Sequence, residues 1–105
     1  MSFNDRAQDF EGRYVHDQEL KFRIEARRNK LLGLWAAGKL GMSDEDASKY
    51  AQDVINVAFQ APGDDGIFNR IRGDFDAAKI EQSDHQIHRH MSECLAEAET
   101  QIRED

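Results

Sequence analysis

The chain has few residues that could form disulfides, interrupt helices or build strands. Cys94 is its single cysteine, so no intramolecular disulfide is available, and this composition suits a reducing compartment. Pro62 is its single proline, and three Val and one Thr stand against twelve Ala, the best helix former. A length of 105 residues suffices for one compact domain. We therefore predict an all-α protein.

Long hydrophobic runs are also missing. The longest mostly apolar run covers only residues 31–37, which is too short to cross a bilayer. The first six residues contain neither a cationic start nor an apolar stretch. We expect no secretion signal and no direct membrane insertion.

Positive charge is scarce, and it is unevenly spread. The 14 Lys and Arg against 21 Asp and Glu give a formal net charge of −7. Residues 1–42 hold eight basic and six acidic side chains, net +2, whereas residues 43–105 hold six and fifteen, net −9. This balance disfavours nucleic acid as a partner.

Apolar residues at helical spacing predict four amphipathic helices, which together are typical of a four-helix bundle. The first stripe lies within residues 15–40, and the others follow at intervals down the chain. In order, the four stripes are Leu20, Ile24, Leu31, Leu34 and Trp35; then Ala47, Tyr50, Ala51, Val54, Ile55 and Ala58; then Ile67, Phe68, Ile71, Phe75 and Ala78; then Ile87, Met91, Cys94, Leu95, Ala98 and Ile102.

Short signals separate these helices. Ser43 and Ser83 are predicted N-caps, and residues 62–66 form the clearest break. Gly73 should weaken the third helix, because glycine has low helix propensity. Gly33 and Ala37 are four residues apart in the first helix, a spacing that allows close approach of a second helix.

The first fourteen residues carry a stripe of their own, formed by Phe3, Ala7, Phe10 and Tyr14. At about 100° per residue, its centre lies about 90° from the centre of the first core stripe. One interpretation is a frayed arm that becomes helical when a partner groove receives the aromatic side chains. The other is an extended first helix whose aromatic residues dock on their own bundle.

No combination of nucleophile and base is recognisable, so we predict that the protein is not an enzyme and needs no cofactor. Cys94 lies on an apolar stripe, where a cysteine usually acts as a small hydrophobic residue. His85 and His88 share a helix face, but His90 points away from His88, so we predict no metal site.

A basic run is the most unusual feature of the sequence. Arg27, Arg28 and Lys30, with Lys21 and Arg23 before them, form a positive patch in an acidic protein. The patch could dock an acidic partner, or it could hold the phosphates of an adenine nucleotide near Trp35. Pairing with acidic residues of neighbouring helices is the alternative interpretation.

The run from residue 26 to residue 37, Ala-Arg-Arg-Asn-Lys-Leu-Leu-Gly-Leu-Trp-Ala-Ala, resembles the alphaproteobacterial family of the F-type ATPase zeta subunit, a natural ATPase inhibitor. The resemblance covers nearly the whole chain. It is also carried by an Asp-Arg pair at the opening, a His-Asp pair before the run, two phenylalanines and a glycine turn: Asp5, Arg6, Phe10, His16, Asp17, Phe22 and Gly41.

The resemblance implies a mobile inhibitory segment at residues 1–16, followed by a four-helix bundle domain at residues 17–105. In this family the segment is thought to enter a catalytic interface of F1-ATPase, become helical and block rotation in the hydrolytic direction. The contacts implied by position are Phe3, Asp5, Arg6, Phe10, Arg13 and Tyr14.

The resulting hypothesis is a regulatory subunit of ATP synthase, cytoplasmic and peripheral to the inner membrane through that complex. The first alternative is a helical module that binds an adenine nucleotide weakly through Arg27, Arg28, Lys30 and Trp35. The second is a protein–protein adaptor with another partner.

Overall fold

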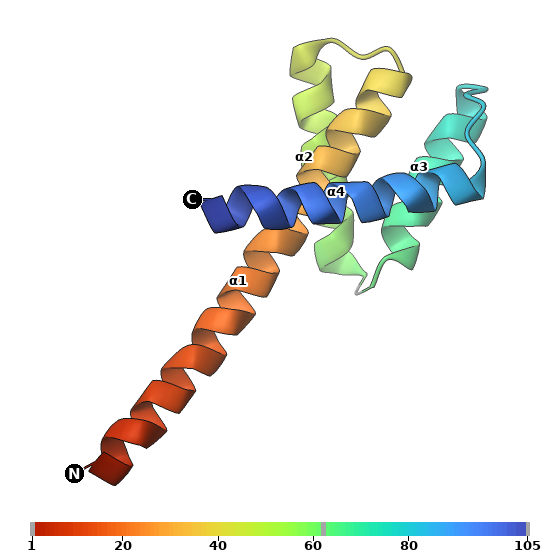
Figure 1. The fold of residues 1–105 in the computed structure, drawn as a ribbon. Coiled ribbons are helices and arrows are strands. Elements are labelled where there is room, and N and C mark those ends of the chain that lie inside the picture. Colours follow the sequence, from red (N-terminus) through yellow and green to blue (C-terminus); the bar gives the residue numbers. More distant parts are fainter. Residues whose placement is uncertain (1, 62, 105) are drawn as a thin grey trace.

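The computed structural model describes the backbone of residues 2–61 and 63–104 and the side chains of residues 17–61 and 63–103. These residues form four α-helices: α1 at Ser2–Lys39, α2 at Asp44–Gln60, α3 at Asp65–Ala77 and α4 at Asp84–Glu104 (Figure 1). The predicted all-α class is confirmed. None of the described helices combines the length and apolar character needed to cross a membrane.

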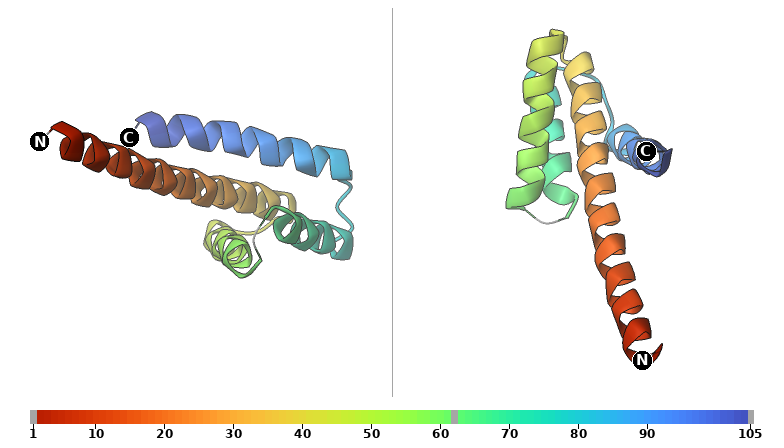
Figure 2. Two further views of the ribbon diagram at one scale, coloured as in Figure 1. Left: turned by 90° about the horizontal axis from the view of Figure 1, so that it is seen from below. Right: turned by 90° about the vertical axis from the view of Figure 1, so that its left-hand side faces the viewer.

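The long helix α1 organises the molecule. Its second half has extensive contacts with α2 and with α4, whereas α3 makes fewer contacts, with α2 and α4. After the loop at residue 41, α2 returns alongside α1, and α4 crosses α1 on another side and runs in the opposite sense (Figure 2). The first half of α1 continues beyond these helices, and the molecule measures 64 × 24 × 22 Å.

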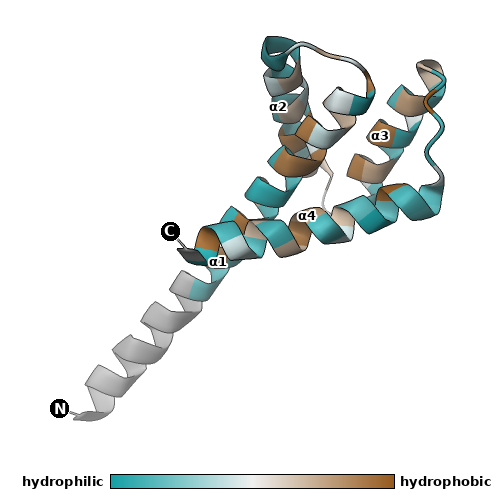
Figure 3. Cartoon of the chain, turned by 45° about the horizontal axis from the view of Figure 1, so that its top comes forward, coloured by the Kyte–Doolittle hydropathy of each residue, from teal (hydrophilic) through white to brown (hydrophobic). Residues whose placement is uncertain are grey.

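The core lies where the second half of α1 meets the other three helices. Along α2, α3, α4 and the described part of α1, hydrophobic residues alternate with hydrophilic ones, as amphipathic packing requires (Figure 3). The stripes predicted for α2, α3 and α4 supply most of the buried side chains, which confirms them. The core consists of Leu32, Ala36, Ala37, Tyr50, Val54, Ile67, Ile71, Phe75, Ile87 and Met91.

The predicted core face of α1 is wrong in its rotation. Leu31, Leu34 and Trp35 are only half-buried, while Leu32, Ala36 and Ala37 are fully buried. The reason is that α2 and α4 cover two different sides of α1, so the deepest face lies between those sides. At about 100° per residue, the centre of the predicted stripe lies about 150° from the centre of this buried face, so the two are nearly on opposite sides of the helix.

Gly33 is the point of closest approach between α1 and α2. A Cβ added to Gly33 would lie 2.7 Å from the Cα of Ala51 and 3.1 Å from its Cβ. Replacing Gly33 or Ala51 by a larger residue would therefore push α1 and α2 apart. The close approach predicted from Gly33 and Ala37 is confirmed at Gly33.

Both predicted serine caps are confirmed. The Ser43 hydroxyl accepts a hydrogen bond from the Asp46 backbone N–H at 3.3 Å. At the start of α4, the Ser83 hydroxyl accepts from the Gln86 N–H at 3.1 Å, and the Gln86 side-chain oxygen accepts from the Ser83 N–H at 2.9 Å. This reciprocal pair is a capping box, which satisfies two backbone donors at the helix start.

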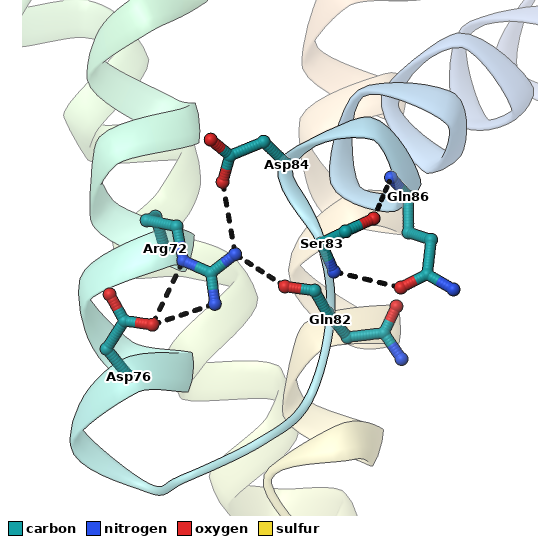
Figure 4. Close-up of polar contacts among 6 residues, drawn as sticks. All are labelled: Arg72, Asp76, Gln82, Ser83, Asp84 and Gln86. Atoms are coloured by element: carbon teal, nitrogen blue, oxygen red, sulfur yellow. Dashed lines mark hydrogen bonds and ion pairs between the residues drawn. The ribbon is translucent and has the colours of Figure 1, made fainter.

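Arg72 on α3 fixes the connection between α3 and α4 (Figure 4). Its guanidinium donates to Asp76 at 2.8 and 3.1 Å, to Asp84 at 3.2 Å and to the carbonyl oxygen of Gln82. One side chain therefore bonds to its own helix, to the loop and to the first turn of α4. These bonds set the direction in which α4 leaves the loop.

Two glycine substitutions should have opposite effects on stability. Gly33→Ala should lower the free energy of unfolding by about 1–3 kcal/mol, because the new methyl group overlaps the Ala51 backbone. Gly73→Ala should raise it by about 0.5–1 kcal/mol, because Gly73 is also mid-helix but has open space around it. Urea denaturation of both variants measures the difference, and a stabilised Gly33→Ala would contradict the close packing.

Candidate interaction surfaces

The predicted partner contacts lie on the first half of α1. Phe3, Asp5, Arg6, Phe10, Arg13 and Tyr14 all precede residue 17, so their side chains lie outside the described residues. Both interpretations of this segment and the division at residue 16 therefore remain predictions.

The first described side chains of α1 show where its packing begins. Residues 17–19 and 21–23 are exposed, Leu20 is half-buried, and Arg28 is the first buried side chain among those described. The buried face of α1 lies about 60° from the stripe of residues 3–14, less than the 90° obtained from the predicted face. The exposure of residues 17–19 and 21–23 therefore supports a separate segment more strongly than the rotation of the stripe does.

The basic run is divided between different sides of α1. Arg28 is only 7% exposed, and its guanidinium bonds to Asn29 at 2.7 Å and to Asp64 at 2.8 Å. It ties α1 to the loop before α3, as the interpretation of pairing with acidic neighbours predicted. Arg27 and Lys30 lie on the other side of the helix, in a groove described below.

Trp35 does not share that groove. Its indole stacks on His90 at 4.1 Å between ring centroids and meets the edge of Phe75 at 5.5 Å. The open space beside Trp35 is lined by Glu93 and Glu97 as well, so the local charge opposes a phosphate group. The four residues predicted for a nucleotide are thus not brought together around one site.

A groove of about 300 Å³ runs along α1 between α2 and α4. Three basic residues of α1 line it together with apolar residues of all three helices: Phe22, Arg23, Ala26, Arg27, Lys30, Ile55 and Ile102. We call it the basic groove. Four other grooves among the described residues each include at least one Asp or Glu.

The cations of the basic groove are not neutralised within the described part of the chain. Arg28, Arg70, Arg72 and Arg89 each have a carboxylate within ion-pair distance. Arg23, Arg27 and Lys30 have none among residues 17–61 and 63–103, although Glu19 precedes Arg23 by one helical turn. Arg27 donates to the neutral Gln101 side chain at 2.7 Å, which in turn donates to Glu97.

Two aromatic rings stand beside the basic groove. Phe22 of α1 and Phe59 of α2 are 55% and 63% exposed, and their ring centroids lie 5.7 Å apart. Large apolar side chains that contact each other in solvent are typical of an interaction surface, whereas single exposed ones are common on any protein. We call these two residues the phenylalanine pair.

The histidines of α4 have separate roles. His88 stacks on Phe68 at 4.3 Å between centroids, His90 stacks on Trp35, and His85 is exposed. Within the described ranges, no three His, Cys, Asp or Glu side chains converge in a way that could hold a metal ion. The two stacked rings join α4 to α3 and to α1.

Cys94 packs at the edge of the core. Burial raises the pKa of its thiol, so the side chain stays protonated rather than becoming a reactive thiolate. This agrees with the prediction of a small hydrophobic residue.

A polar cluster between α2 and α3 was missed by the sequence analysis. The Tyr50 hydroxyl donates to Asp74 at 2.7 Å, the Arg70 guanidinium donates to the same carboxylate at 2.8 Å, and Arg70 lies over the Tyr50 ring. The Arg70 and Asp74 spacing was visible in the sequence, but Tyr50 joins them from another helix. The three side chains line a groove of about 560 Å³.

The alkaline limit of stability should depend on Tyr50. Burial, and then the hydrogen bond to Asp74, raise the pKa of Tyr50 above its ordinary value. The folded state therefore holds the proton of the Tyr50 hydroxyl more tightly than the unfolded state does. The contribution of Tyr50 to the free energy of unfolding is thus complete below about pH 10 and decreases as the pH rises further.

In Tyr50→Phe, the free energy of unfolding should drop by about 1 kcal/mol at neutral pH, because one hydrogen bond is lost. Above about pH 10, the free energy of unfolding of the variant should decrease less with pH than the free energy of unfolding of the unsubstituted chain. Equal alkaline slopes for the Tyr50→Phe variant and the unsubstituted chain would contradict this account.

The described residues present grooves and exposed aromatic side chains on a helical scaffold, as expected for a protein that acts through binding. The chain matches the family of the ATPase inhibitor subunit zeta over residues 1–101 and belongs to that family.

One solved structure supports the fold in detail. A solution NMR structure shares 32% sequence identity with this chain at a TM-score of 0.72, covering 81% of this chain and 96% of the other. No match was found among curated proteins. The family match confirms the resemblance stated from the sequence, and its name identifies an ATPase inhibitor subunit.

Proposed function

We propose that this chain is a non-catalytic regulatory subunit that binds the F1 sector of ATP synthase and restrains ATP hydrolysis. The acting part is the segment of residues 1–16, and residues 17–105 hold and present it. The observation that carries the proposal is the family match, which includes this segment together with α1, α2, α3 and most of α4.

The described part of α1 supports this division of roles. Side chains from residue 28 onward are held by α2 and α4, whereas residues 17–19 and 21–23 are exposed. Followed towards its N-terminus, α1 therefore leaves the core several residues before it reaches the segment. A partner can reach this end of α1 without displacing the packing of the other helices.

In the proposed mechanism, Phe3, Phe10 and Tyr14 anchor the segment in an apolar groove at a catalytic interface of F1. Asp5, Arg6 and Arg13 set its register by charge pairing. Fixing the segment costs conformational entropy, so the affinity depends strongly on a few aromatic anchors. Once seated, the segment opposes rotation in the hydrolytic direction.

Deletion of residues 2–16 should abolish inhibition of ATP hydrolysis by F1, measured with increasing amounts of the deleted chain. The double variant Phe10→Ala with Tyr14→Ala should need at least about tenfold more protein for half-inhibition, because buried aromatic anchors carry most of the energy of such an interface.

The matched control is Asn4→Ala with Gln8→Ala, which changes two residues of the same segment away from the aromatic stripe. This variant should inhibit as the unsubstituted chain does. Full inhibition by the deleted chain would exclude the mechanism, and equal losses in both double variants would exclude the aromatic anchors.

A further inference from the structure

The basic groove combines two properties that single out a class of ligand. Its walls and floor are apolar, with Phe22, Ile55 and Ile102 around Ala26. Its rim carries Arg23, Arg27 and Lys30, for which no carboxylate partner occurs among the described side chains. Such a groove fits a segment that presents carboxylates beside apolar side chains.

Charge makes this surface distinct from the rest of the molecule. The protein has a net charge of −7, and the other grooves compared above include acidic residues. A cationic groove in an anionic protein attracts an acidic surface at one place and repels it elsewhere, so it also sets the orientation of the encounter. Arginine at two of the three rim positions favours paired hydrogen bonds to carboxylates.

The apolar surface next to the groove is larger than a small anion could cover. Phe22 belongs both to the groove wall and to the phenylalanine pair, and a second depression of about 70 Å³ links the pair to Ile55 and Ala58, with Glu25 also in its lining. Contact with a protein segment would cover these rings. A phosphate or a nucleic acid backbone would leave them in water.

We propose that the basic groove and the phenylalanine pair form a second docking surface, which binds an acidic, partly apolar segment of the same partner that receives residues 1–16. This rests on the proposed function, because it takes F1 as the partner. Phe22 lies six residues after the end of the inhibitory segment on the same helix. A partner that holds the segment is therefore close enough to contact the groove.

The test compares two charge-reversed variants of the full chain for binding to F1 at low and at physiological ionic strength. Arg23→Glu with Lys30→Glu changes the groove, and Lys39→Glu with Lys79→Glu makes the same change of charge at exposed lysines away from it. The groove variant should bind about tenfold more weakly than the control variant, and its affinity should depend less on salt.

A third variant, Phe22→Ala with Phe59→Ala, should weaken binding without changing the salt dependence, since it removes only apolar contacts. The chain lacking residues 2–16 should retain weak, salt-sensitive binding through the groove. Circular dichroism of each variant checks that the helices remain folded, which the exposure of all six substituted side chains favours.

The outcomes separate this proposal from the preceding one. If the unsubstituted chain binds F1 and inhibits it, while the groove and control variants bind equally, the docking surface is refuted and the inhibitory segment is not. If the unsubstituted chain does not bind F1, the result refutes the proposed function itself, on which the docking surface depends. Binding of an oligonucleotide that the groove variant loses would overturn the assignment to a protein segment.

Discussion

The close contact of α1 with α2 at Gly33 and Ala51 determines how the rest of the molecule is arranged. Because a Cβ at Gly33 would lie 2.7 Å from the Ala51 backbone, the two helices approach more closely there than any larger residue would allow. α4 then packs on another side of α1, supported by the stack of His90 on Trp35. The second half of α1 is thereby enclosed by the other helices.

This arrangement gives α1 two functions along its length. From residue 28 it is a structural helix, held by core packing and by the pair of Arg28 with Asp64. Before residue 24 its described side chains are mostly exposed, and they include Phe22 and Arg23 of the basic groove. Because α1 runs without a break from these exposed residues into the core, the bundle and the proposed inhibitory segment are joined without a loop.

Much of the fold followed from local patterns. Helical spacing, two serine caps and one glycine-rich break located α2, α3, α4 and the second half of α1, because these signals act within a few residues of each other. The core face of α1 could not be obtained in this way. Leu31 and Trp35 appeared to be central residues, but which face is deepest depends on the two sides from which α2 and α4 approach, and no local pattern encodes that.

The candidate surfaces were predicted less completely. The basic run was visible in the sequence, but its division into a buried Arg28 and the rim residues of the groove depends on the position of Asp64 and of α4. The phenylalanine pair and the cluster of Tyr50, Arg70 and Asp74 join residues from different helices. Such contacts can be derived only once the helices are placed.

The central claim is that α1 is anchored by its second half and offers its first half to a partner. Amide hydrogen exchange along α1, measured with and without F1, tests it most directly. We predict slow exchange from about residue 28 to the end of α1 in the isolated protein, fast exchange before residue 24, and protection of the fast part when F1 is added. Uniformly slow exchange along the whole helix in the isolated protein, unchanged by F1, would contradict the account.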